Sequence, residues 1–519
     1  METTLADLLR KKHAKELERQ AIDNEITKIH LTYSSIANNK SKILSLPLET
    51  TAAIFQFLCR SGDSADYIEV LSHVCHSWRA LALSRAEYWE DFFSTGETNS
   101  QVNRLHVYLE RSKDRPFNFA VRVGQRYPVI IEKLLEVAVE HIHRLRHLSV
   151  VSEDYTWTGT EFIKKLHAMS APRLELIQIS INAITNGADH VRQTKFLGGQ
   201  ADNLTTLYLD ATWIADASWL QEFPNIKTIQ IHTNSGLTSV LAPRLPTETL
   251  TRLFQCPNLE NLSAAGLRFE NFVNFPIIKT KAAKLKNLRC SDGSMLEFIL
   301  RSVDAPKLEL FIAQRLTFHD GIRIPSPDDL EQPLFPSLHT VALTDCSIMP
   351  DYPSSGTEVV LTFTKATNNA KHVYLTSCHQ TNIEEWLFYE MVEEFKRKNI
   401  IVYPNMEQLY CAFTRAPFGG GASYTDYTTI LKSRTDSLKK HCTLHLYDHE
   451  VESWKIGDPE SWKVMEDRGY YRRIDPEYPD GVDLVPWPPR AAQLERDGWM
   501  SYGEHLSLCE ELDDDLERE

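Results

Sequence analysis

The sequence predicts an α/β protein in which a short all-α head precedes a solenoid of repeats, with parallel strands lining its concave face. Apolar residues recur at helical spacing before residue 95, one apolar motif repeats from about residue 140, and segments of helical spacing separate its copies. A chain of 519 residues is too long for one compact core. We therefore expect a helical domain joined to an elongated repeat array.

Composition and charge narrow the class of protein. The chain is 42% hydrophobic and 24% charged, which is ordinary for a folded globular protein, and its formal charge of -15 argues against general nucleic-acid binding. The N-terminal region lacks the apolar core of a secretory signal, and no stretch is apolar enough for a membrane span. Nine cysteines without a CxxC pair indicate reduced thiols. We expect a cytoplasmic or nuclear protein that contacts neither membranes nor nucleic acid.

Residues 1–44 are predicted to form an N-terminal helix with a short heptad seam. The apolar residues recur at alternating steps of four and three and then at seven, at Ile22, Ile26, Ile29, Tyr33, Ile36 and Ile43. This seam has two interpretations, a dimeric coiled coil or packing of the helix against the next domain. Because three heptads are short for a coiled coil in isolation, we favour packing and keep dimerisation as the alternative.

Residues 45–95 are predicted to form a small helical domain. A helix starts at Pro47, whose missing N–H has no partner in a first turn, and its apolar face carries Leu48, Ala52, Phe55 and Leu58. After the turn "SGDSAD", a second apolar face carries Tyr67, Leu71, Val74, Trp78 and Leu81. One short helix seldom buries so wide a face. Its surplus belongs either to the core of the protein or to a partner.

These residues resemble the F-box. The match spans about 45 residues and comprises Leu46, Pro47, Glu49, Ile54, Phe55, Leu58, Val74, Cys75, Trp78, Leu81, Ala82 and Trp89. It departs from the family at Thr50 and Thr51, where large aliphatic residues are preferred. The segment "YLERSKDRPFNFAV" at 108–121 is similar to the segment that follows the F-box in many fungal F-box domain-containing proteins.

The resemblance to F-box leucine-rich-repeat proteins implies a substrate receptor. Such a chain binds a Skp-type adaptor, joins a cullin ubiquitin ligase and selects a protein substrate, without itself transferring ubiquitin. The motif positions, some facing the adaptor and others holding the helices together, are Leu46, Pro47, Ile54, Phe55, Leu58, Val74, Cys75 and Trp78. The alternative is a non-catalytic repeat scaffold that self-associates through its N-terminal helices.

Residues 96–448 are predicted to form an irregular leucine-rich-repeat solenoid. Eleven segments carry an apolar residue, a second three positions on and a third two further, as in "DNLTTLYLD" and "PNIKTIQIH". Six leading anchors lie 22 to 33 residues apart, at Leu204, Ile226, Leu259, Leu285, Leu308 and Leu338. Helical segments such as 247–255 and 294–303 lie between copies, so the strands must be parallel. Stacked repeats then bury the core and leave one face open to ligands.

Residues that alternate with the core positions are candidates for substrate binding. Along a strand, successive side chains point to opposite faces, so the partners of Leu207, Leu209, Ile229 and Ile231 are expected to face away from the core. Exposed tyrosines are frequent binding anchors. The candidates on these grounds are Tyr208, Asp210, Gln230, His232, Tyr410 and Tyr447.

Residues 449–519 lose the repeat rhythm and are predicted to be an acidic C-terminal cap or tail. The segment contains prolines and tryptophans and ends in "CEELDDDLERE". We favour a cap over the last repeat, which would otherwise expose apolar edges, rather than a separate binding motif.

No pattern in the sequence indicates catalysis, a metal or a cofactor. His141 and His143 lack cysteine or carboxylate neighbours at a zinc spacing, and "FGGGAS" at 418–423 lacks the residues of a phosphate-binding loop. The chain has no GxSxG, HExxH or kinase motif. We therefore expect a binding protein rather than an enzyme.

Overall fold

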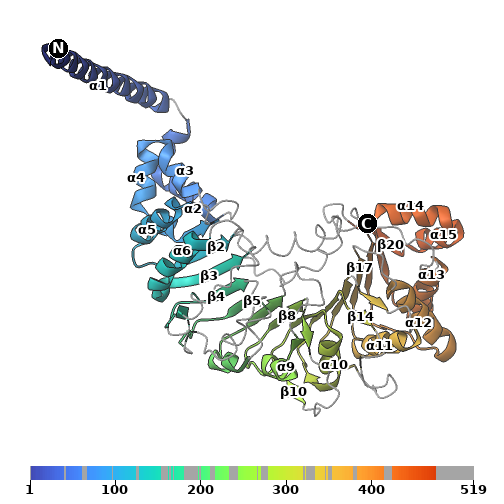
Figure 1. The fold of residues 1–519 in the computed structure, drawn as a ribbon. Helices are drawn as coiled ribbons and strands as arrows, with labels where there is room; N and C mark the ends of the chain where they lie inside the picture. Colours follow the sequence, from blue (N-terminus) through green and yellow to red (C-terminus); the bar gives the residue numbers. More distant parts are fainter. Residues whose placement is uncertain are drawn as a thin grey trace. The chain divides into compact units, whose positions relative to one another are not determined.

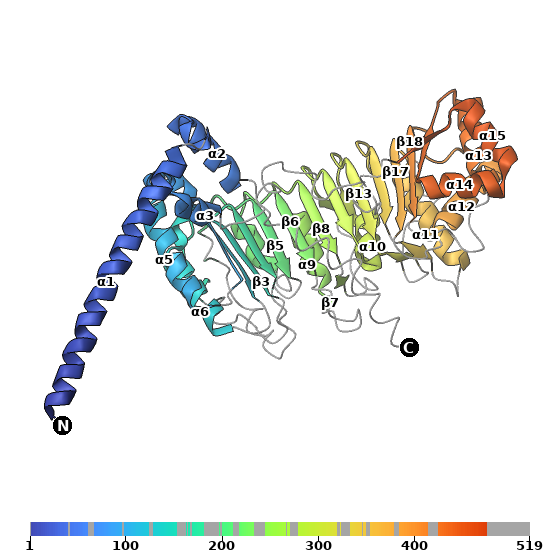
Figure 2. The same cartoon turned by 90° about the horizontal axis from the view of Figure 1, so that it is seen from above.

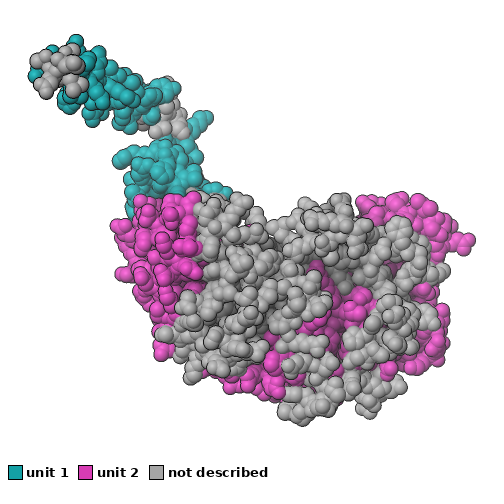
Figure 3. Space-filling view, in the orientation of Figure 1, with its two compact units in different colours: residues 1–84 teal, residues 85–519 magenta. Residues whose placement is uncertain are grey.

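The chain divides into two compact units, unit 1 (Met1–Ser84) and unit 2 (Arg85–Glu519), which Figure 3 distinguishes by colour. The computed structural model describes residues 2–39, 42–60, 67–95, 98–123, 128–152, 162, 165–166, 169–180, 197, 200–210, 217–232, 244–265, 267–269, 279–318, 322, 333–344, 346–348, 353–377, 383–413 and 424–474. The glycine-rich segment 418–423 and the tail from 475 to 519 lie outside these residues.

Unit 1 consists of helices. They are α1 (Glu2–Asn39), the 3-10 helix η1 (Lys42–Ser45), α2 (Leu48–Arg60), α3 (Tyr67–Val74) and α4 (His76–Ser84). The expected helix start at Pro47 is confirmed, because its carbonyl accepts the Thr51 N–H at 3.0 Å in the first turn of α2. The Thr51 hydroxyl donates to the same carbonyl and Thr51 is buried, so a hydroxyl is accommodated where the F-box family prefers an aliphatic side chain.

The apolar segment after residue 67 forms two helices rather than one. The helix breaks at Cys75, whose thiol accepts the Trp78 N–H at 3.5 Å near the start of α4. The Arg79 side chain donates to the Ser72 carbonyl at 2.8 Å, near the end of α3. Both contacts satisfy main-chain groups that helix ends leave without intrahelical partners, so the break is stabilised locally.

Unit 2 is a mixed α/β structure built on a large parallel sheet of fourteen strands, in the order β1-β2-β3-β4-β5-β6-β8-β11-β13-β15-β17-β18-β19-β20 (Figures 1 and 2). The strands are β1 (Asp91–Ser94), β2 (Phe117–Val123), β3 (Leu145–Ser152), β4 (Leu176–Ser180), β5 (Thr206–Asp210), β6 (Thr228–His232), β8 (Asn261–Ala265), β11 (Asn287–Cys290), β13 (Leu310–Gln314), β15 (Thr340–Thr344), β17 (His372–Ser377), β18 (Gln408–Phe413), β19 (Thr443–Leu446) and β20 (Tyr471–Arg473).

The predicted parallel arrangement of the repeat motif is confirmed. All eleven copies contain a strand of this sheet, from β3 to β19, and each strand pairs in parallel with its neighbours. The sheet extends beyond the motif at both ends, with β1 and β2 before the first copy and β20 after the last. The last strand belongs to the segment that the sequence predicts to be a cap.

Helices and short strands connect the strands of the sheet, and Figure 1 shows α9, α10 and α11 along the same side of it. The helices are η2 (Ala86–Trp89), α5 (Ser100–Ser112), α6 (Pro128–Glu140), η3 (Ile142–Arg144), η6 (Ala217–Glu222), α9 (Thr247–Phe254), α10 (Gly293–Ser302), α11 (Pro353–Ala366), α12 (Ile383–Lys398), α13 (Tyr424–Ser433), the π-helical η8 (Arg434–Leu438), α14 (Asp448–Gly457) and α15 (Pro459–Arg468). Three parallel pairs join β7 (Arg244–Leu245) to β9 (Arg268–Phe269), β10 (Thr280–Lys281) to β12 (Val303–Asp304), and β14 (Thr317–Phe318) to β16 (Ser347–Ile348).

The core of unit 2 is built from equivalent positions of successive strands. Leu207 pairs in register with Ile229, which pairs with Leu262, and all three side chains are fully buried. Because strands in a sheet lie about 4.8 Å apart, such rows of aliphatic side chains pack continuously across the sheet. The periodic leucines are therefore core residues, as expected.

Asparagine side chains in the turns before the strands link neighbouring repeats. The side-chain amide of each donates to a main-chain carbonyl of the preceding turn, at 2.7 Å from Asn203 to Pro172, 2.8 Å from Asn225 to Asp202 and 2.7 Å from Asn258 to Pro224. The "PN" and "DN" pairs of the motif thus carry a hydrogen bond as well as a turn.

Candidate functional site

Unit 1 keeps apolar surface although it has a core of its own. Of the F-box-like positions, Leu46, Ile54 and Val74 are exposed, at 37%, 36% and 55%, and Pro47 is exposed as well. Exposed apolar residues on a folded unit indicate a surface that a partner covers. These four positions are therefore candidates for contact with a partner.

The remaining F-box-like positions hold the helices together. Phe55 is completely buried, and its ring meets that of Trp78 edge to face, with centroids 5.1 Å apart. Leu58, Cys75 and Trp78 are half-buried. Phe55 is therefore a core residue of unit 1, and Trp78 lies at the edge of that core.

Two exposed apolar stripes include Phe57 and Val70, which are not among the F-box-like positions. On α2, Phe57 is 72% exposed and lies three residues after Ile54, so both side chains are neighbours on the helix surface. On α3, Val70 and Val74 are four residues apart and both exposed. The sequence alone could have revealed Phe57, because it lies on the side of α2 opposite Phe55, where a polar residue is expected.

On the sheet of unit 2, the expected exposure of four candidate residues is wrong. Tyr208, Asp210, Gln230 and Tyr447 are all buried. Tyr208 lies in register between Gln178 and Gln230 of the adjacent strands, so side chains of equivalent positions cover one another. Tyr447 follows β19, where it packs against Ile474 and its main-chain N–H donates to Glu450. The side chain of His232 lies outside the described residues.

The sixth candidate, Tyr410, belongs to a stack of aromatic rings on the last strands. It is half-buried between Tyr374, with centroids 4.3 Å apart, and His445, with centroids 4.0 Å apart. The three residues are in register on β17, β18 and β19. The Tyr410 hydroxyl donates to the Gln408 side-chain oxygen at 3.0 Å. A row of parallel rings offers edges rather than faces to a ligand.

Burial shifts the protonation of this stack. It lowers the pKa of His445 to about 4, with further contributions from the positive charge of Arg472 and from His372. Burial also raises the pKa of Tyr374 and of Tyr410 above the usual value for tyrosine. His445 is therefore neutral at pH 7 and can remain stacked on Tyr410 without a counter-ion.

The substitution His445→Phe is expected to reduce the acid sensitivity of the fold. An unfolded histidine titrates near pH 6.5, so between about pH 6.5 and 4 the unfolded chain binds more protons and stability falls as the pH drops. Phenylalanine preserves the ring stacking but has no group that takes up a proton. Urea unfolding at both pH values measures the free energy of unfolding. Between pH 7 and pH 4.5 this free energy should fall by about 1–2 kcal/mol less in the variant than in the wild type. The control is His106→Phe, at an exposed site on α5. If all three proteins lost the same free energy of unfolding between pH 7 and pH 4.5, His445 would not be a source of the acid sensitivity.

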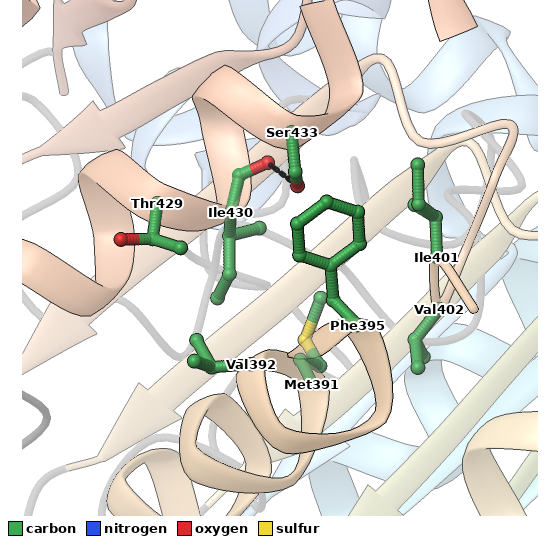
Figure 4. Close-up of a pocket in the computed structure, with 8 residues that line it drawn as sticks. All are labelled: Met391, Val392, Phe395, Ile401, Val402, Thr429, Ile430 and Ser433. Atoms are coloured by element: carbon green, nitrogen blue, oxygen red, sulfur yellow. Dashed lines mark hydrogen bonds between the residues drawn. The ribbon is translucent and has the colours of Figure 1, made fainter. Parts of the chain in front are cut away.

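A pocket between α12 and α13 is too small for a ligand. Figure 4 shows its apolar lining, which includes Met391, Phe395 and Ile430, and its volume is about 10 Å³. Sites for small molecules enclose roughly 300–1,000 Å³. Among the described residues no cluster of His, Cys, Asp or Glu could hold a metal ion, and no described helix is long and apolar enough to cross a membrane.

Comparison with known proteins adds no relative to these observations. No model of a protein family matches the chain, and no curated protein matches it. The candidate surfaces consequently rest on the geometry of the two units and on the residues themselves.

Proposed function

We propose that this protein is the substrate-recognition subunit of a cullin ubiquitin ligase of the SCF type. Helices α2, α3 and α4 act as an F-box that binds a Skp-type adaptor, and unit 2, as an irregular leucine-rich-repeat solenoid, binds a protein substrate. The observation that carries the proposal is the exposure of Ile54, Phe57, Val70 and Val74 on a unit whose core is complete around Phe55.

The energetics favour a protein partner for these side chains. Burying a phenylalanine or valine side chain is worth about 1.5–3 kcal/mol, and exposure forfeits that stabilisation. Unit 1 has no need of these four residues for its own core, in which Phe55, Ile68, Leu81 and Ala82 are buried. An apolar surface on an adaptor would bury these exposed side chains.

The repeat organisation of unit 2 supports the other half of the proposal. Each motif supplies one strand, a recurring pattern of core side chains and, in several turns, an asparagine bonded to the preceding turn. Such an array presents a long surface assembled from many strands, which suits recognition of a protein. The receptor would select the substrate, and other subunits of the ligase would transfer ubiquitin.

A mixing experiment tests the proposal. The full chain and a purified Skp-type adaptor are combined and analysed by size-exclusion chromatography with light scattering. We expect a stable complex that contains one adaptor for each copy of the chain. The variant Leu46→Ala with Pro47→Ala should lose the complex while its circular dichroism stays native, because both side chains are exposed. Failure of the wild-type chain to bind the adaptor would leave the scaffold interpretation in its place.

A further inference from the structure

The last strand of the sheet brings an exposed arginine to the face that carries the ring stack. Arg472 pairs in register with His445, which stacks on Tyr410, so the three side chains form one row across β18, β19 and β20. Arg472 is exposed, and no carboxylate of the described residues pairs with it. The side chain of Arg473 points to the opposite face and pairs with Asp448 at 2.9 Å. Arg472 is therefore a cation without a counter-ion among the residues that the structure describes.

The surface around Arg472 attracts carboxylates. From β15 to β20, none of the strand positions that share a face with Tyr410 is Asp or Glu. The rings of Tyr374 and Tyr410 are half-buried and present their edges, where an aromatic ring carries partial positive charge. The acidic residues of α14 and α15 belong to the other face, because Trp462 of α15 packs against Tyr471 with ring centroids 4.5 Å apart, and α14 packs on α15. One face thus combines an arginine with ring edges and has no acidic side chain on these strands.

The described chain ends on this same face. Ile474, the last residue that the structure describes, follows Arg472 by two positions, and its N–H donates to the Leu446 carbonyl at 2.9 Å. Successive side chains of a strand alternate, so the side chains of Ile474 and Arg472 point to the same face. The side chain of Ile474 packs there against Tyr447. Residues 475–519 are therefore attached beside the ring stack.

Residues 475–519 carry most of the negative charge of the protein. They contain fourteen Asp and Glu but three Lys and Arg, and the formal charge of the whole chain is -15. When extended, this segment reaches up to about 150 Å, whereas β17 lies about 14 Å from β20. A segment tethered next to a site meets it at an effective concentration of about millimolar, so a weak intrinsic affinity is enough for occupancy. Charge, length and point of attachment all suit the surface around Arg472.

We propose that the acidic segment 475–519 binds back onto the sheet, with carboxylates against Arg472 and the ring edges of Tyr374 and Tyr410. The contact itself does not depend on the adaptor, because none of these residues belongs to unit 1. Its consequence rests on the proposed function, since a substrate that binds this face of the sheet has to displace the segment. The segment thereby sets a threshold for acidic substrates, which compete with it for Arg472.

Limited proteolysis of the full chain tests the contact. Chymotrypsin cleaves after Trp499 and Tyr502, and mass spectrometry follows the rate of cleavage. Arg472→Gln should raise this rate about 10-fold, because the bound segment loses a charge-assisted contact. The matched control is Arg473→Gln, which removes the same charge one position away on the opposite face and should leave the rate unchanged. Equal cleavage rates in the two variants would overturn the proposal.

A second measurement identifies the occupant. A fluorescein-labelled peptide of residues 475–519 is titrated into the full chain and into a chain that stops at Ile474 and keeps every described element. Fluorescence anisotropy should show micromolar binding to the shortened chain and about 10-fold weaker binding to the full chain, whose own segment occupies the surface.

Two results of this titration would contradict the proposal. Equal affinity for both chains would mean that the surface is open to a separate acidic partner, and absence of binding to the shortened chain would mean that the segment does not bind the sheet. Adaptor binding should be the same for both chains, because it uses unit 1. Failure of this proposal is therefore distinguishable from failure of the proposed function.

Discussion

Exchanging Phe57 and Val70 for aspartate is expected to abolish adaptor binding and to leave unit 1 folded. They are the most exposed large apolar side chains of α2 and α3, at 72% and 60%, so their removal costs the free unit little. Placing a carboxylate in an apolar contact without a partner is strongly unfavourable. We expect the affinity for a Skp-type adaptor to fall more than about 100-fold, as measured by isothermal titration calorimetry.

The matched control for this variant is Phe55→Ala on the same helix. Phe55 is completely buried against Trp78, and removal of a buried phenylalanine costs about 3–5 kcal/mol, which a small helical unit can scarcely tolerate. This variant should lose its helical circular dichroism as well as its adaptor binding. If the Phe57 and Val70 variant bound the adaptor as the wild type does, the exposed stripes would not be the docking surface.

The parallel sheet was predictable because its signal is local and repeated. Each copy of the motif combines a turn residue, a leading anchor and two apolar residues in alternation, and the repetition of this pattern outweighs the ambiguity of any one copy. The strands that the motif missed have different sequences. β1 is "DFFS" and β20 is "YRR", and neither carries the leading anchor that marks the others. Their pairing comes from the adjacent strand, β2 for β1 and β19 for β20, rather than from their own pattern.

The candidate site was only partly predictable because exposure depends on neighbours distant in sequence. Alternation correctly places Tyr208 on the face opposite Leu207, but its lateral neighbours Gln178 and Gln230 come from other repeats and bury it. On α2 the helical period placed Phe55 on the apolar face without showing that its whole ring is enclosed. The break at Cys75 depends on the Arg79 side chain, whose reach to Ser72 no periodicity indicates.

A buried arginine is a second position that the sequence does not reveal. Arg434 begins the π-helical turn η8 and is completely buried, and burial lowers its pKa from the usual value. Its guanidinium donates to the carbonyl of Val402 at 3.2 Å and to that of Met406 at 2.8 Å. One side chain thus ties η8 to the turn before β18 and satisfies two main-chain acceptors.

Arg434→Met is expected to destabilise the C-terminal repeats by about 2–4 kcal/mol, because the two carbonyls stay buried and lose their donor. The relief of a buried charge offsets part of this cost but leaves the acceptors unpaired. Urea unfolding followed by the fluorescence of Trp454 and Trp462, on α14 and α15, measures the effect near the site.

Two further variants separate this bridge from a general effect of charge. Arg434→Lys retains the charge but cannot reach both carbonyls with one ammonium, so it should recover only part of the lost stability. Arg468→Met removes an exposed arginine that pairs with Asp436 at 3.4 Å, and its unfolding midpoint should match the wild type. An unchanged midpoint in Arg434→Met would mean that water or another donor satisfies both carbonyls, and that the arginine contributes nothing to the joint between η8 and β18.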